Sequence, residues 1–160
     1  MDPNSNKKFT NSFQKDKYKG YFQSANLEFD KIIAEVGSGS PCGEFLRRYW
    51  HPVALSSELK KQPKSIKVLG EDLILFRTPK EELGLVHKNC PHRNASLEYG
   101  KCEDRGIRCC YHGWLFSPDG EILETPGEDK NSKQAQNIKK KLRLGAYPVL
   151  EFNKLIFAYM

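Results

Sequence analysis

Residues 89–114 read NCPHRNASLEYGKCEDRGIRCCYHGW and contain two short groups of metal-binding side chains. Cys90 and His92 form the first pair, and Cys109 and His112 form the second, with sixteen residues between His92 and Cys109. Each pair supplies one thiolate and one imidazole, which are ligands for transition metals. An asparagine or a glycine follows each pair and predicts a turn whose backbone amides face a bound centre. The stretch therefore predicts a mixed Cys2His2 site.

The composition predicts a soluble chain of one domain with a real hydrophobic core. The chain has 160 residues, of which 38% are hydrophobic, and its mean hydropathy is -0.67. Its apolar runs, such as residues 155–160, are far shorter than the roughly 20 residues that span a bilayer. The first twenty residues carry lysines but no apolar core and no small-residue cleavage site. We therefore expect a cytoplasmic protein.

Five cysteines are present, and four of them lie within residues 90–110. In a reducing compartment, such crowding indicates metal binding rather than disulfides. Cys110 adjoins Cys109, but its use as the ligand would shorten the second pair to Cys-x-His, so spacing favours Cys109. A small buried or semi-exposed thiol is the favoured role for Cys110, and structural roles are favoured for Cys42 and Cys102.

The formal net charge is +6, and the excess lies in the lysines of the first twenty residues and in residues 139–143. Neither run is interleaved with aromatic residues on one face, as a nucleic-acid interface requires. Solvated lysines are the favoured interpretation, and an acidic redox partner is the alternative.

Two segments precede the metal-binding stretch. Residues 1–26 are polar and predict a flexible tail, and residues 27–58 predict a helical lead-in. The lead-in divides into a short helix over 27–36 and a second helix over 43–50, with Pro52 closing the turn that follows.

The chain from residue 59 onward predicts an all-β body of short antiparallel strands. The expected strands are residues 65–69, 73–77, 83–87, 107–109, 115–116, 121–123, 147–152 and 155–159. Asp119-Gly120 predicts a hairpin turn between two of them, and the polar residues 126–137 predict a loop. The metal-binding stretch is expected to project from this body as two loops.

The two pairs resemble the motif of the Rieske iron–sulfur proteins, Cys-x-His followed by Cys-x2-His. The resemblance implies a Rieske domain over residues 59–160 with a [2Fe-2S] cluster, in which Cys90 and Cys109 bind one iron and His92 and His112 bind the other. A structural zinc site is the alternative, because zinc also accepts two cysteines and two histidines. Zinc fingers usually place like ligands in each pair, which this chain does not.

Three positions near the predicted ligands indicate a particular class of Rieske protein. Respiratory members carry two cysteines that form a clamping disulfide between the loops, and a serine whose hydroxyl donates to the cluster. This chain has Ala95 and Tyr111 at the cysteine positions and Trp114 at the serine position, so it lacks both the disulfide and that hydrogen bond. Fewer hydrogen bonds to cluster sulfur favour the oxidised form, so we expect a potential on the order of -150 mV, at the low end of the Rieske range.

Segments outside the loops resemble the N-terminal domain of aromatic-ring-hydroxylating, phthalate-dioxygenase-like oxygenase large subunits. They are GEFLRRYWHPVALSSEL (43–59), GEDLILFR (70–77) and AYPVLEFNKLIFAYM (146–160). The resemblance implies a reductase or ferredoxin as electron donor, and an oxygenase catalytic domain as acceptor, in a homotrimer. Arg93 and Trp114 are candidates for the docking surface, and packing is an equal alternative for Trp114.

The oxygen-activating site of that family is expected to be absent from this chain. It is a mononuclear non-haem iron held by two histidines and a carboxylate in a C-terminal catalytic domain. Only His51 and His87 remain here after the cluster ligands are assigned, and they lie on separate predicted elements. We expect electron transfer without catalytic residues in this chain. A free-standing Rieske ferredoxin is the alternative, and the substrate, the reductase and the oligomeric state are left open.

Overall fold

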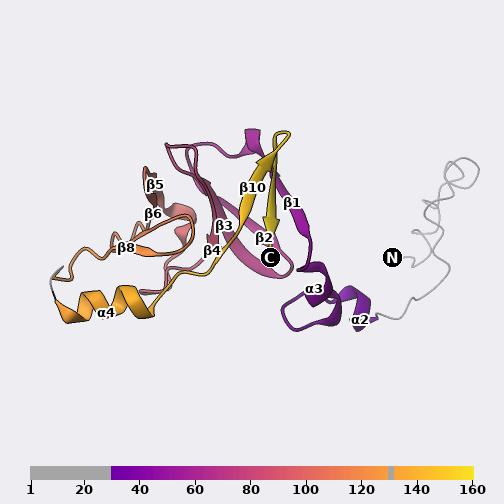
Figure 1. Cartoon of the computed structure of the whole chain (residues 1–160), viewed down its shortest axis with the longest axis horizontal. Helices are drawn as coiled ribbons and strands as arrows, with labels where there is room; N and C mark the ends of the chain where they lie inside the picture. The colour runs from indigo at the N-terminus through magenta and orange to yellow at the C-terminus, as the bar shows by residue number, and fades with distance from the viewer. Residues whose placement is uncertain (1–29, 130–131) are drawn as a thin grey trace, which may run out of the picture. The chain divides into compact units, whose positions relative to one another are not determined.

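The computed structural model describes residues 30–129 and 132–160, and those from Lys31 onward belong to one compact unit. Its strands form three antiparallel sheets, ordered β1-β11-β10, β2-β3-β4-β9 and β5-β6-β7-β8 (Figure 1). The strands are β1 Trp50–Leu55, β2 Lys64–Val68, β3 Glu71–Arg77, β4 Leu83–His87, β5 Lys101–Glu103, β6 Gly106–Arg108, β7 Leu115–Phe116, β8 Ile122–Glu124, β9 Ala146–Tyr147, β10 Val149–Phe152 and β11 Leu155–Tyr159. The helices are α2 Lys31–Ala34, α3 Pro41–Leu46 and α4 Lys133–Lys141, with 3-10 turns at Ser56–Glu58 and Leu97–Tyr99. The predicted all-β class is confirmed, and the tail over 1–26 lies outside the described residues.

Strand β3 is buried on both faces and separates two hydrophobic cores. Leu73 and Leu75 point into one core, with Ile156 and Ala158 of β11. Ile74 and Phe76 point into the other core, which contains both predicted cysteine ligands. Successive residues of a strand point to opposite faces of the sheet, so the buried residues 73–76 contribute side chains to both cores. The sheet β2–β3–β4–β9 therefore packs against the first core on one face and against the second core, which contains Cys90 and Cys109, on the other.

The lead-in differs from the prediction of a helix over 43–50. Helix α3 begins earlier, at Pro41, where the Ser40 side chain caps it by accepting a hydrogen bond from the Gly43 amide. It ends at Leu46, and Trp50 already pairs with Tyr159 in the β1–β11 ladder. Pro52 therefore lies within strand β1 and does not close a turn. A proline is tolerated there because β1 is an edge strand with a register shift beside Pro52.

The loop predicted over 126–137 is wrong in its second half, because α4 occupies Lys133–Lys141. The segment is rich in lysine and glutamine, which are good helix formers. Ile138 is its one long apolar side chain, and it packs against the core that contains Cys90 and Cys109. A single apolar contact gives no periodic signal, which is why the polar sequence predicted a loop.

Candidate metal centre

The first predicted ligand pair lies on a closed turn that follows β4. The Cys90 amide donates to the Ala95 carbonyl at 2.9 Å, and the Asn94 amide donates back to the Cys90 carbonyl at 2.9 Å. Asn94 has a φ of 59°, a left-handed conformation that asparagine tolerates better than most residues. Residues 89 and 96 form an isolated bridge that closes the base of the loop.

The second pair lies on a turn of the same construction between β6 and β7. The Cys109 amide donates to the Trp114 carbonyl at 2.8 Å, and the Gly113 amide donates to the Cys109 carbonyl at 3.1 Å. Gly113 has a φ of 72°. In both loops the backbone of the cysteine is hydrogen-bonded to the residues four and five positions later. The residue four positions later has a left-handed backbone conformation in each loop. The predicted asparagine and glycine turns are therefore confirmed.

The two loops bring the predicted thiol ligands together inside the core. Cys90 and Cys109 are each only 3% exposed, and they belong to the same buried cluster. Burial raises the pKa of the Cys90 thiol, the backbone amide of His92 opposes this, and the neighbouring Cys109 raises it further. Without a bound cation the Cys90 thiol stays protonated, so metal binding would release its proton.

The predicted imidazole ligands meet nearer the surface. The ring centroids of His92 and His112 lie 4.7 Å apart, and both residues are half-buried. The Trp114 ring stacks on His92, with centroids 4.6 Å apart and planes 2° from parallel. Loss of water around the ring lowers the pKa of His112, and the neighbouring His92 and Arg93 lower it further. A lowered pKa keeps this imidazole neutral, which is its metal-binding form.

The four predicted ligands thus separate into two thiols and two imidazoles. No three histidine, cysteine, aspartate or glutamate side chains gather as a single-ion site within residues 30–129 and 132–160. Cys110 is exposed, and Cys102 is half-buried on β5. Of the other histidines, His51 lies 2.8 Å from the Leu46 carbonyl through Nε2, and His87 lies 3.5 Å from a carboxylate oxygen of Glu71.

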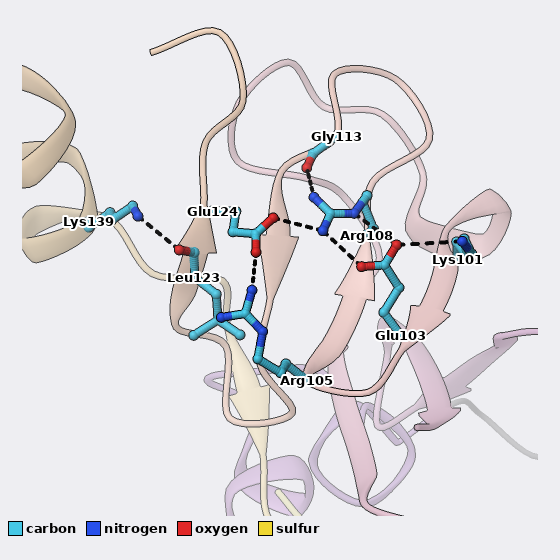
Figure 2. Close-up of polar contacts among 8 residues, drawn as sticks. All are labelled: Lys101, Glu103, Arg105, Arg108, Gly113, Leu123, Glu124 and Lys139. Atoms are coloured by element: carbon cyan, nitrogen blue, oxygen red, sulfur yellow. Dashed lines mark hydrogen bonds and ion pairs between the residues drawn. The ribbon is translucent and has the colours of Figure 1, made fainter. Parts of the chain in front are cut away.

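Sequence reasoning missed one polar network beside the second loop (Figure 2). Arg108, the residue before Cys109, forms ion pairs with Glu103 and Glu124 and donates to the Gly113 carbonyl at 2.7 Å. Arg105 pairs with the other carboxylate oxygen of Glu124. The sequence offered no signal for this network, because Glu103, Arg108 and Glu124 lie on three strands whose pairing is set by the fold.

Buried thiols and outer imidazoles on paired loops of an antiparallel β-domain define the class of mixed cysteine–histidine iron–sulfur domains. The Rieske [2Fe-2S] domain family matches residues 49–148, and the chain belongs to this family. It is 51% identical over 135 residues to the tert-butanol monooxygenase / tert-amyl alcohol desaturase oxygenase subunit of Aquincola tertiaricarbonis, covering 84% of this chain and 27% of that protein. It is 35% identical over 136 residues to the phthalate 4,5-dioxygenase oxygenase subunit of Pseudomonas putida, covering 83% of this chain and 30% of that protein.

A solved structure of the reduced complex between oxygenase and ferredoxin in carbazole 1,9a-dioxygenase superposes with a TM-score of 0.61 at 28% identity, covering 81% of this chain and 30% of that chain. The chain thus matches the N-terminal region of oxygenase subunits and spans less than a third of each protein compared here. As a Rieske domain, it transfers electrons through a [2Fe-2S] cluster. Among the residues with described structure, no helix is long and apolar enough to cross a membrane.

Proposed function

We propose that Cys90 and Cys109 bind one iron of the cluster, and that His92 and His112 bind the other. The observation that carries this assignment is the two-and-two separation of the donors: both thiols are buried in one core, and the imidazoles meet nearer the surface. The donor set fits the cluster, since thiolates and imidazoles are the ligands of its two irons. One tetrahedral zinc ion would need all four donors around a single point.

The bound cluster supplies one-electron redox chemistry. The core around Cys90 and Cys109 excludes water from the thiolate side. The stacked ring of Trp114 fixes the orientation of His92. Because His92 and His112 lie at the exposed edge, we place the exit of the electron at their rings.

In this proposal the domain serves an oxygenase whose mononuclear iron lies outside these 160 residues. A reductase or ferredoxin donates the electron, and the catalytic domain of a neighbouring subunit in a homotrimer accepts it. The relatives are oxygenase subunits, and one similar structure holds an oxygenase with a ferredoxin, which supports both partners. The free thiols of the described cysteines support a location in the cytoplasm.

An apolar sheet face supports the packing of this domain against an oxygenase catalytic domain. Trp50 lies opposite Tyr159, and Phe152 lies opposite Leu155, on the outward side of the sheet β1–β11–β10. Trp50 is 45% exposed and Phe152 is 63% exposed. Clustered exposed apolar side chains are typical of an interaction surface. The relatives contain the additional polypeptide that could cover it.

A matched pair of substitutions tests the ligand assignment. Cys109→Ser should abolish the visible absorbance and the labile sulfide of anaerobically purified protein, because serine supplies no thiolate. Cys110→Ser, one residue away and exposed, should keep both. Retention of the cluster in Cys109→Ser with its loss in Cys110→Ser would move the ligand to Cys110.

Oxygen consumption tests the division between electron delivery and catalysis. Supplied with a reductase and an aromatic substrate, the purified chain should accept electrons but hydroxylate nothing. Substrate hydroxylation by the chain alone would contradict the proposal. A free-standing ferredoxin role would be favoured if the reduced chain passed electrons to a separate acceptor protein and bound no oxygenase catalytic domain.

A further inference from the structure

Arg108 contacts both ends of the second ligand loop. Its backbone ends strand β6 and leads directly into Cys109. Its side chain returns to the far end of the loop, where Nη1 donates to the Gly113 carbonyl at 2.7 Å. Gly113 follows His112, so this hydrogen bond acts on the Gly113–Trp114 peptide, one residue beyond the proposed imidazole ligand.

The Arg108 guanidinium is held from the two edge strands of the small sheet, β5 and β8 (Figure 2). Glu103 of β5 accepts from Nε at 3.0 Å and from Nη2 at 2.8 Å. Glu124 of β8 accepts from Nη2 at 2.8 Å, and its second oxygen binds Arg105. The hydrogen bonds that Arg108 donates to both glutamates raise its pKa, so it stays charged. Bidentate pairing with a carboxylate fixes the plane of the guanidinium, which lysine cannot reproduce.

The first loop has a weaker contact in the same place. Asn89, the residue before Cys90, donates from its side-chain amide to the side-chain oxygen of Asn94 at 2.9 Å. In each loop, therefore, the side chain of the residue before the cysteine donates a hydrogen bond to the left-handed residue, which is Asn94 in the first loop and Gly113 in the second. The Asn89 contact is neutral and exposed, whereas the Arg108 contact is charged and partly buried. Hydrogen bonds of charged groups are the stronger kind.

We propose that Arg108 is a positioning residue that holds loop 109–114 closed and so keeps His112 in its ligating place. Glu103 and Glu124 serve by orienting Arg108, and Arg105 supports only Glu124. The inference rests on the ligand assignment proposed above. It assigns to the small sheet β5–β8 the task of fixing the histidine-bearing end of the second loop.

Three variants of the cluster-loaded chain test this role. Arg108→Gln removes the charge and the bond to Gly113, Arg108→Lys keeps the charge without the bidentate geometry, and Arg105→Gln is the matched control. The first readout is the rate at which an iron chelator bleaches the visible absorbance. The second is the EPR line shape of the reduced protein, and the third is the thermal unfolding midpoint. A merely structural role would lower the unfolding midpoint without changing the line shape.

We expect Arg108→Gln to bleach roughly tenfold faster than the wild type and to broaden the EPR lines, because a charged hydrogen bond is lost. Arg108→Lys should bleach roughly threefold faster, because its point charge holds Gly113 less firmly. Arg105→Gln should stay within about twofold of the wild type, as expected for an exposed ion pair.

The proposal is overturned if Arg108→Gln bleaches at the rate of Arg105→Gln with a wild-type line shape. If Arg108→Gln does not fold, Arg108→Lys decides, and a wild-type bleaching rate and line shape in that variant count against the proposal. A wild-type chain that binds no cluster would overturn the ligand assignment together with this inference. A loaded wild type that is insensitive to Arg108 would overturn this inference alone.

Discussion

Cys90 and Cys109 lie in the hydrophobic core, whereas His92 and His112 lie at its edge. The spacing of these four residues predicted them as a set, because their chemistry is read directly from residue type. Their division into an inner thiol pair and an outer imidazole pair depends on how two loops fold against one core. The stacking of Trp114 on His92 could not be predicted from the sequence for the same reason, because the two residues belong to different loops.

Replacing an imidazole ligand by a thiolate should lower the reduction potential. The wild-type midpoint is expected on the order of -150 mV, and a value above about +100 mV would contradict the low-potential assignment. His112→Cys adds a negative charge that favours the oxidised cluster, so its midpoint should fall by on the order of 100 mV or more. Redox titration followed by visible absorbance measures both. Cys110→Ser is the control and should leave the midpoint unchanged, and an unchanged midpoint in cluster-loaded His112→Cys would argue against His112 as a ligand.

At the scale of elements, the strands of the meander β2–β3–β4 and the hairpin β10–β11 were predicted because their alternation and turns are local signals. Strand β1 was missed because its partner, β11, lies at the other end of the chain. Strand β5 was missed because two of its three residues, Lys101 and Glu103, are charged and give no strand pattern. Short strands obtain their stability from the sheet and not from their own sequence.

Gly106, at the start of β6, should not tolerate a side chain. Its φ is 148°, and an added Cβ would lie 1.8 Å from the Phe116 carbonyl oxygen of β7. Gly106→Ala should therefore lower the free energy of unfolding by about 2 kcal/mol or more, measured by urea denaturation with circular dichroism. Gly127→Ala is the control, because Gly127 has a φ of 94° with open space around it. It should cost only about 1 kcal/mol, and equal losses in both variants would show that the close approach of β6 to β7 does not matter.

At the scale of the whole described unit, one carboxylate connects four elements. Glu71, at the start of β3, pairs with Arg47 at the end of α3 at 2.6 Å. It also accepts from the Tyr147 hydroxyl of β9 and lies 3.5 Å from His87 of β4. Sequence patterns located β3 and β4 but not this junction, because its members are far apart in the chain. The single strand predicted over 147–152 is divided between β9 and β10, which belong to different sheets.

Acid should weaken this junction. Burial raises the pKa of Glu71, but hydrogen bonds from Tyr147 and Arg47 outweigh it, and the net pKa is lowered. A lowered carboxylate pKa stabilises the fold above the ordinary value of 4.5, and this contribution is lost as pH falls through the folded-state pKa. Glu71→Gln should therefore be less stable than the wild type by roughly 1–3 kcal/mol at neutral pH, a difference that shrinks below about pH 4.

Urea denaturation of both proteins across this pH range measures the difference, and Asp72→Asn is the control. Asp72 is an exposed neighbour, 3.5 Å from Lys67, and its loss should cost less than about 1 kcal/mol at any pH. A Glu71→Gln difference that stayed constant down to about pH 3 would contradict the assignment of this pH dependence to Glu71.

The central claim is that this chain holds a cysteine- and histidine-ligated [2Fe-2S] cluster for electron transfer. The most direct test is EPR spectroscopy of the anaerobically purified, dithionite-reduced chain, together with iron and labile-sulfide analysis of the same sample. We predict about two irons and about two sulfides per chain and a rhombic signal of the mixed-ligand Rieske type that is silent before reduction. One zinc per chain, with no labile sulfide and no EPR signal on reduction, would contradict the claim.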